Sequence, residues 1–189
     1  MKQKVSDYIA DRLAQERISQ VFTVTGGGAM HLNDSLGHHP GLSCLYHHHE
    51  QAAAMAAEAY ARVDNRMAAV CVTSGPGATN AITGVLCAWM DSIPMLVLSG
   101  QVRYDTTVRH SGLKIRTMGV QEYDITPSVE PMTKYAVMVT DPLTIRYHLE
   151  RAIYLAKTGR PGPCWLDLPL NVQSAVVETD DLKAYDPSE

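Results

Sequence analysis

The sequence of 189 residues has little of what marks membrane, secreted or nucleic-acid-binding proteins. No apolar run approaches the roughly 20 residues that cross a bilayer, and residues 1–6 lack the hydrophobic region of a signal peptide. Only 19% of the residues are charged, and 16 Lys and Arg stand against 20 Asp and Glu, a formal net charge of −4. Because positive charge is not in excess, we expect neither a nucleic-acid nor a membrane partner.

The cysteines lack the spacing of a metal or redox motif. No two stand as Cys-x-x-Cys, and three of the four lie inside apolar runs. This pattern favours reduced core residues in a cytoplasmic protein. The four are Cys44, Cys71, Cys87 and Cys164.

Apolar segments and helical patterns alternate along the chain. With 46% hydrophobic residues and Gly and Pro spread throughout, the composition excludes a disordered, collagen-like or coiled-coil protein. Segments 21–24, 43–46, 67–73, 94–99, 132–139 and 163–168 are expected to be strands, and helical periodicity covers 5–16, 29–36, 49–62, 78–88 and the stretch from 141 to 159. Residues 101–131 show no clear period. We predict an α/β fold: a doubly wound, mainly parallel six-stranded sheet with helices on both faces.

Unusual residues gather where the predicted strands end, which is where such sheets bind ligands. The loops are 25–30, 47–51 and 73–80. The glycine run Gly26–Gly28 fails the dinucleotide fingerprint, because His31 stands at the third glycine position, and no Gly-Lys-Ser/Thr follows as in a phosphate loop. A tight turn and a ligand-contacting loop both remain open for it.

His47-His48-His49-Glu50 resembles a metal site at first sight. The zinc pattern needs a second histidine four residues after His49, where Ala53 stands instead. Two interpretations of the Glu50 carboxylate remain. It can stabilise the start of a helix, or it can lie among Ala52, Ala53 and Met55 in a nearly apolar pocket, where a carboxyl group keeps a proton to share.

Taken in order, these segments resemble the pyrimidine-binding domain of thiamine-diphosphate enzymes, and most of all the acetolactate synthase (acetohydroxyacid synthase) large subunit. The resemblance covers nearly the whole chain. It is carried by residues 21–22, 26–27, 49–51, 59–62, 73–84, 91–94, 99–101, 121–122, 159–163 and 167–169.

The resemblance implies roles for individual residues. Glu50 is expected to donate a hydrogen bond to N1′ of the aminopyrimidine ring of thiamine diphosphate, and Gln101 and Gln121 look like active-site glutamines, with Gln121 placed with Glu50 as catalytic. The pyrimidine pocket or its rim is expected to comprise Gly26, Gly27, Thr73, Ser74, Gly75, Pro76, Gly77 and Asn80.

The implied activity is decarboxylation of pyruvate, a 2-keto acid, and transfer of the two-carbon unit to a second 2-keto acid. The chain departs from the family pattern at Thr25, Gly28, Ala52 and Val120, which leaves the acceptor open. A keto-sugar acceptor, simple decarboxylation and a catalytically silent assembly module are the alternatives. An intact Glu50 disfavours the silent module, which has no need for that carboxylate.

The resemblance also implies parts that this sequence does not contain. Residues 1–170 correspond to the pyrimidine-binding domain and 171–189 to a linker towards a central domain that carries much of the FAD site. The Gly-Asp-Gly and paired asparagines of the diphosphate-binding domain, which holds Mg²⁺, are absent. We expect an excised domain rather than a natural separate subunit, inactive alone and paired as a homodimer.

Overall fold

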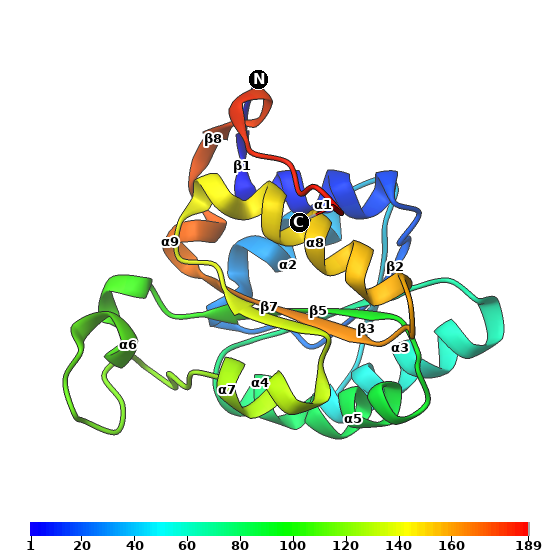
Figure 1. The fold of residues 1–189 in the computed structure, drawn as a ribbon. Coiled ribbons are helices and arrows are strands. Elements are labelled where there is room, and N and C mark those ends of the chain that lie inside the picture. Colours follow the sequence, from blue (N-terminus) through cyan, green and yellow to red (C-terminus); the bar gives the residue numbers. More distant parts are fainter. Residues whose placement is uncertain (189) are drawn as a thin grey trace.

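A parallel sheet lies between two layers of helices in the computed structural model, which describes residues 1–188 (Figure 1). Its six strands are all parallel, in the order β3-β2-β4-β5-β7-β6. They are β2 (Gln20–Thr23), β3 (Ser43–Tyr46), β4 (Ala68–Val72), β5 (Met95–Gln101), β6 (Tyr135–Met138) and β7 (Pro163–Pro169). Each falls on one of the six predicted segments. The predicted doubly wound sheet with helices on both faces is confirmed.

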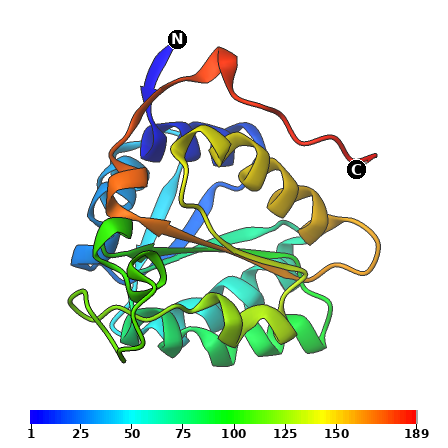
Figure 2. The same cartoon turned by 60° about the vertical axis from the view of Figure 1, so that its left-hand side comes forward.

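Two helix layers cover the two faces of the sheet (Figure 2). One layer contains α1 (Val5–Gln15), α2 (Met30–His38) and α8 (Ile145–Lys157), and the other contains α3 (Glu50–Asp64), α4 (Pro76–Asn80), α5 (Ile82–Met90) and α7 (Thr126–Val129). Strand residues alternate between the two cores, so that Cys71 packs with the first layer and Val72 with the second. Among the described residues every helix is too short or too polar to span a bilayer.

Short elements occupy the connections and both ends of the described chain. They are α6 (Val108–Ser111), α9 (Leu170–Gln173) and the 3₁₀ turns η1 (Gly27–Ala29), η2 (Tyr104–Thr106), η3 (Glu130–Met132), η4 (Pro142–Thr144) and η5 (Thr179–Asp181). A feature that the sequence did not predict is a small antiparallel sheet of β1 (Lys2–Lys4) and β8 (Val176–Glu178). Residues in the expected linker therefore pack on the domain, with Leu182 buried. The boundary at residue 170 stays a prediction.

Two predicted elements differ in extent. The strand expected over 132–139 begins only at Tyr135, because Pro131 lies in a 3₁₀ turn that precedes it. The helix expected over 78–88 is divided into α4 and α5 at Ala81, whose N–H bonds the carbonyl of Ala78 in the tighter i to i+3 pattern.

The alanine-rich helix α3 packs closely against α5. A Cβ atom placed on Gly84 of α5 would lie 2.6 Å from the Cβ of Ala54, too near for any side chain. Ala53, Ala54 and Ala57 are buried at this face. These small residues allow a neighbouring backbone to approach closely, and the neighbour belongs to the same chain.

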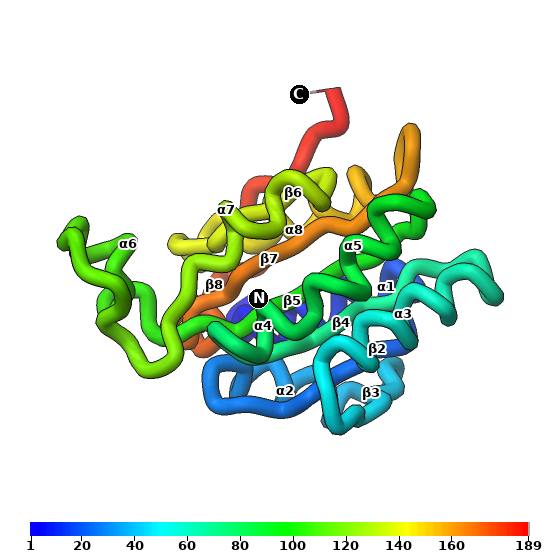
Figure 3. Tube along the Cα trace, turned by 90° about the horizontal axis from the view of Figure 1, so that it is seen from below, coloured from blue at the N-terminus to red at the C-terminus, as the bar shows by residue number. Residues whose placement is uncertain are grey.

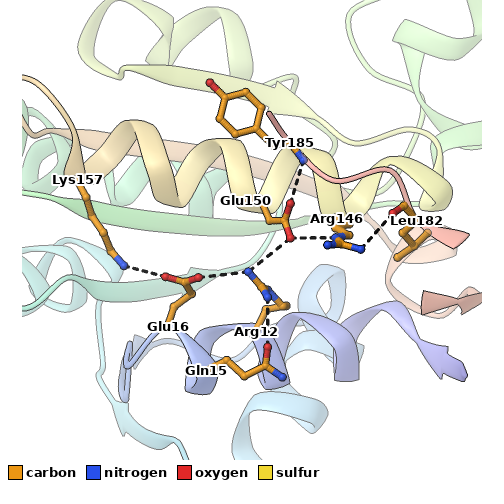
Figure 4. A network of polar contacts seen from close by, with 8 residues as sticks. All are labelled: Arg12, Gln15, Glu16, Arg146, Glu150, Lys157, Leu182 and Tyr185. Atoms are coloured by element: carbon orange, nitrogen blue, oxygen red, sulfur yellow. Dashed lines mark hydrogen bonds and ion pairs between the residues drawn. The ribbon is translucent and has the colours of Figure 1, made fainter. Parts of the chain in front are cut away.

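An ionic network joins α1, α8 and the segment after η5 (Figure 4). The carboxylate of Glu150 lies 2.9 Å from Nε of Arg146 and 3.5 Å from Nη2 of Arg12, and it accepts the N–H of Tyr185 at 2.9 Å. Glu16 lies between Arg12, at 3.2 Å, and Lys157, at 3.1 Å. Because only 16% of the Glu150 side chain is exposed, water cannot fully replace these partners.

A buried polar cluster links β5 to β7 under the helix layer of α5 and α7. The hydroxyl of Ser99 donates to Asp167 Oδ1 at 2.6 Å and accepts Nε1 of Trp165 at 2.8 Å. Gln101 Nε2 donates to Asp167 Oδ2 at 3.2 Å. Burial raises the pKa of Asp167 to about 7, although the hydrogen bonds from Ser99 and Gln101 act in the opposite direction.

We predict that Glu150→Gln lowers the free energy of unfolding by about 1–3 kcal/mol, because two arginines lose the charge that faces them. Urea denaturation measures this. The matched control is Asp105→Asn, which neutralises the carboxylate of an exposed pair with Arg103 and should change the midpoint little. Equal midpoints for the two variants would show that the network does not stabilise the fold.

A second prediction concerns pH. Because the pKa of Asp167 is higher in the folded state than its ordinary value of 3.8, the folded state binds this proton more tightly. Its contribution is complete below pH 4 and is lost as the pH rises through about 7, a decline on the order of 4 kcal/mol. Urea denaturation between pH 4 and 8 should show this slope in the wild type and a flatter one in Asp167→Asn.

Ser99→Ala is the comparison for that measurement. It removes a hydrogen bond that lowers the pKa of Asp167, so the loss of stability should move to higher pH. A wild-type profile that matches Asp167→Asn throughout this range would contradict the assignment of the slope to Asp167.

Candidate functional site

The strand order places three of the predicted loops side by side. From β2 the chain crosses to β3 on one side, and from β3 it crosses back to β4 on the other side of β2. Such a switch point opens a crevice at the carboxyl ends of the strands. Thr23 at the end of β2 lies in register with Tyr46 of β3 and Cys71 of β4. The segments that follow, 24–29, 47–50 and 73–77, therefore start at one edge of the sheet.

Thr73 fills the space that two glycines leave between these segments. A Cβ on Gly26 would lie 2.5 Å from the Cβ of Thr73, and a Cβ on Gly77 would lie 2.6 Å from its Cγ2. Thr73 Oγ1 also accepts the N–H of Gly28 at 3.0 Å. Gly26 has an extended backbone with φ −169°, so a tight turn does not require it. Close packing against Thr73 is what requires glycine at this position.

Gly27 differs from both of its glycine neighbours. It is exposed, and no atom lies within 4 Å of the position that its Cβ would take. The backbone there is open to a ligand on one side, whereas a Cβ on Gly28 would meet the hydroxyl of the buried Ser74 at 2.8 Å. A tight turn was one interpretation of the glycine run, but close packing explains Gly26 and Gly28, and only Gly27 remains open for contact with a ligand.

Glu50 is the first residue of α3, and its carboxylate reaches across to α4. Nδ2 of Asn80 donates to Oε2 of Glu50 at 2.9 Å. The other oxygen, Oε1, lies 3.3 Å from where a Cβ on Gly77 would stand. The helix cap is His49, whose Nδ1 accepts the N–H of Gln51 at 3.1 Å. Glu50 thus stands free of the capping hydrogen bond and faces the glycine loop.

The predicted apolar surround of Glu50 is only partly present in this chain. Ala53 is buried, but Ala52 is exposed and Met55 is 39% exposed. The described residues leave this side of the carboxylate open.

The two glutamines occupy different environments. Gln101 is buried, and its Nε2 donates to the backbone oxygen of Tyr123 at 2.8 Å as well as to Asp167. Gln121 is exposed and has a left-handed backbone with φ 56°. Its carbonyl oxygen lies 2.1 Å from where a Cβ on Gly75 would stand, so only glycine allows this approach. The loop of Gln121 therefore adjoins the loop that begins α4, whose first residue is the exposed Pro76.

Sequence reasoning missed two features of this region. The contact between Gly75 and Gln121 joins segments with no common periodicity, so the sequence carried no signal for it. The carboxylate of Glu122 accepts three backbone N–H groups, those of Val108, Met118 and Gly119, at 2.6, 2.9 and 3.0 Å. These three hydrogen bonds fix the backbone conformation between Val108 and Glu122.

No metal-binding group is present within the described part of the chain: residues 1–188 contain no cluster of three or more His, Cys, Asp or Glu side chains placed to hold an ion. In the histidine run, Nδ1 of His47 contacts the carbonyl of Leu45 at 3.0 Å, and His49 serves as the helix cap. All four cysteines are free, and burial raises the pKa of the Cys71 and Cys164 thiols to about 12.

The residues fit a flat heteroaromatic ring of the kind that the resemblance implies. Gly27 exposes backbone, Gly77 lacks the Cβ that would approach the carboxylate, and Glu50 offers one oxygen while Asn80 holds the other. A ring nitrogen that accepts a hydrogen bond could pair with that oxygen. The arrangement suits a cofactor that needs a proton held at one defined atom.

Comparison with known proteins shows the family. Residues 3–123 match the family described as "Thiamine pyrophosphate enzyme, N-terminal TPP binding domain". The chain is 37% identical to the acetolactate synthase large subunit of Lactococcus lactis subsp. lactis over 177 residues, which are 93% of this chain and 29% of that protein. It is 35% identical to acetolactate synthase isozyme 3 large subunit of Escherichia coli, with 97% of this chain and 32% of the relative covered. For the acetolactate synthase large subunit of Corynebacterium glutamicum the identity is 40%, over 88% of this chain and 26% of the relative.

The chain thus spans about a third or less of the length of these relatives. Within that span the family match takes in the glycine run, Glu50 and the loop from Thr73 to Asn80. The chain belongs to the N-terminal TPP-binding domain family of thiamine pyrophosphate enzymes.

Proposed function

We propose that this chain is the N-terminal, pyrimidine-binding part of a thiamine-diphosphate-dependent enzyme of acetolactate synthase type. The observation that carries the proposal is the placement of Glu50: one carboxylate oxygen accepts Asn80, and the other faces the space beside Gly77. The similarity to acetolactate synthase large subunits over most of the chain supports the same choice.

The proposed role of Glu50 is to hold a proton at one atom. Because Oε2 accepts a hydrogen bond from Asn80, Oε1 is the oxygen that carries the proton and donates it to N1′ of the aminopyrimidine ring. Gly26, Gly27 and the loop from Thr73 to Gly77 would line the ring. Thiamine diphosphate, when bound, supplies the electron sink for decarboxylation.

The proposed reaction joins two 2-keto acids without an external oxidant or reductant. The bond between the carboxylate and the carbonyl carbon of pyruvate breaks, CO₂ leaves, and the electron pair forms a new bond to the carbonyl carbon of the acceptor. The acceptor's oxygen takes up one proton. Gln121, exposed at the rim beside Gly75, is proposed to contact the reacting groups, and Gln101 is proposed to line the cofactor side of the same edge.

The remaining parts of such an enzyme are proposed to lie outside this sequence. A diphosphate-binding domain would hold Mg²⁺ and a central domain would hold FAD, so the 189 residues alone are expected to be inactive. We place the complete enzyme in the cytoplasm.

The test of this function is Glu50→Gln in the complete enzyme that contains the chain. The amide keeps the size of the side chain but cannot hold and return the proton, so acetolactate formation from pyruvate should fall by about 10²- to 10⁴-fold. The matched control, Asp64→Asn, removes a carboxylate at the opposite end of α3 and should retain wild-type turnover. Near-normal turnover of Glu50→Gln would reject the assignment.

We also propose that the chain pairs as a homodimer through the outer side of α3 and α5, which lie next to each other in one layer (Figure 3). Met55, Leu86 and Trp89 are 39%, 39% and 38% exposed there. Exposed apolar side chains grouped on adjoining helices are typical of a protein interface.

Leu86→Glu should therefore shift the complete enzyme towards monomer, which light scattering measures directly. A buried charge at an apolar interface has no partner to compensate its desolvation. The control is Leu143→Glu, a 59% exposed leucine on η4, which should leave the mass unchanged. A dimer mass that persists in Leu86→Glu would place the interface elsewhere.

A further inference from the structure

A cleft of about 470 Å³ opens between the start of α4 and the loop of residues 116–123. It adjoins the proposed cofactor loop, because Gly75 and Pro76 belong to both. Its lining residues are Gly75, Pro76, Thr79, Arg116, Thr117, Gly119, Gln121, Glu122 and Tyr123.

The wall of this cleft is fixed by hydrogen bonds to its backbone. Glu122 ties Val108, Met118 and Gly119 together through their N–H groups. The buried Gln101 holds the carbonyl of Tyr123 at 2.8 Å. The segment that carries the lining side chains is thus anchored at Met118, Gly119 and Tyr123, so the fold fixes this wall of the cleft.

Arg116 is the one cation among the residues that line the cleft, and residues 1–188 offer it no partner. Elsewhere in residues 101–131 Arg103 pairs with Asp105 at 3.1 Å and Arg109 with Asp124 at 3.3 Å. Within residues 1–188 no ion pair or hydrogen bond engages the guanidinium of Arg116.

The one carboxylate in the lining does not neutralise Arg116. Both oxygens of Glu122 are turned to backbone N–H groups, which satisfy them. An unpaired guanidinium therefore remains in the cleft. A guanidinium presents its N–H groups in a planar fork that matches a carboxylate or a phosphate and binds either one with two hydrogen bonds.

We propose that Arg116 binds the anionic group of the acceptor substrate and so determines which acceptors the enzyme uses. The inference rests on the proposed function and deepens it: the acceptor carries a carboxylate or a phosphate, and it occupies the cleft with its reacting carbonyl towards Gly75. Lys114, two residues before Arg116 and also without a partner in the described chain, adds a second positive charge to this stretch of the chain.

The experiment compares acceptors in the complete enzyme that contains this chain, with pyruvate as donor. Arg116→Gln should raise KM for the anionic acceptor 2-ketobutyrate by about 10- to 100-fold. It should change KM for the neutral acceptor acetaldehyde, and KM for pyruvate as donor, by less than about twofold. Arg116→Lys keeps the positive charge but loses the planar fork of N–H groups. Its KM for 2-ketobutyrate should therefore lie between those of the wild type and Arg116→Gln.

Arg109→Gln is the matched control. Arg109 is a cation of the nearby helix α6 that pairs with Asp124 and does not line the cleft. The acceptor KM values of this variant should equal those of the wild type. A phosphorylated keto sugar tested beside 2-ketobutyrate tells which anion the site takes: the acceptor with the lower wild-type KM and the larger loss in Arg116→Gln is the preferred class.

The possible results distinguish a failure of the role proposed for Arg116 from a failure of the proposed function. Equal changes for 2-ketobutyrate and acetaldehyde, or no change for either anionic acceptor, would overturn the role of Arg116 while pyruvate decarboxylation continues. A wild-type enzyme that releases no CO₂ from pyruvate would instead overturn the proposed function itself.

Discussion

The close packing of Thr73 between Gly26 and Gly77 is the contact on which the rest of the site depends. It brings the loop after β2 against the loop after β4, with about 2.5 Å between Thr73 and the positions where side chains on the glycines would begin. Any larger residue at either glycine would separate the loops. With the loops together, α4 starts beside the N-terminus of α3, and Asn80 comes within 2.9 Å of Glu50. The placement of Glu50 beside Asn80 therefore depends on the steric fit of Thr73 between the two glycines.

The fold and the gathering of the candidate loops at one edge of the sheet could be predicted from the sequence because both depend on local patterns. Continuous apolar runs such as 67–73 identified strands buried on both faces, and β4 (Ala68–Val72) is fully buried. The carboxyl ends of parallel strands meet at one edge, so the glycine run and Glu50 were expected together. The alanines of α3 allow the close approach of α5 at Gly84.

What could not be predicted depends on contacts between distant segments. The pairing of β1 with β8 joins residues at opposite ends of the described chain and has no local pattern of its own. The network around Glu150 requires α1 and α8 to be adjacent already. In residues 101–131 the short helices are held by side chain to backbone bonds, such as those of Glu122, rather than by an apolar stripe. Hydrophobic periodicity therefore predicts no helix or strand in that segment.

Under the proposed function, the loop of residues 113–123 separates acceptor choice from the proton transfer assigned to Glu50. Its backbone is held from inside by Gln101 and Glu122, whereas Leu113, Met118 and Val120 are 56%, 52% and 83% exposed. Side chains that bury little area can change at small cost to folding, because stability is lost mainly where buried groups lose partners. Glu50, the carboxylate proposed to hold the proton, lies on α3, away from this loop. Substitutions of these exposed residues can thus accumulate on the loop without disturbing the Glu50 and Asn80 pair.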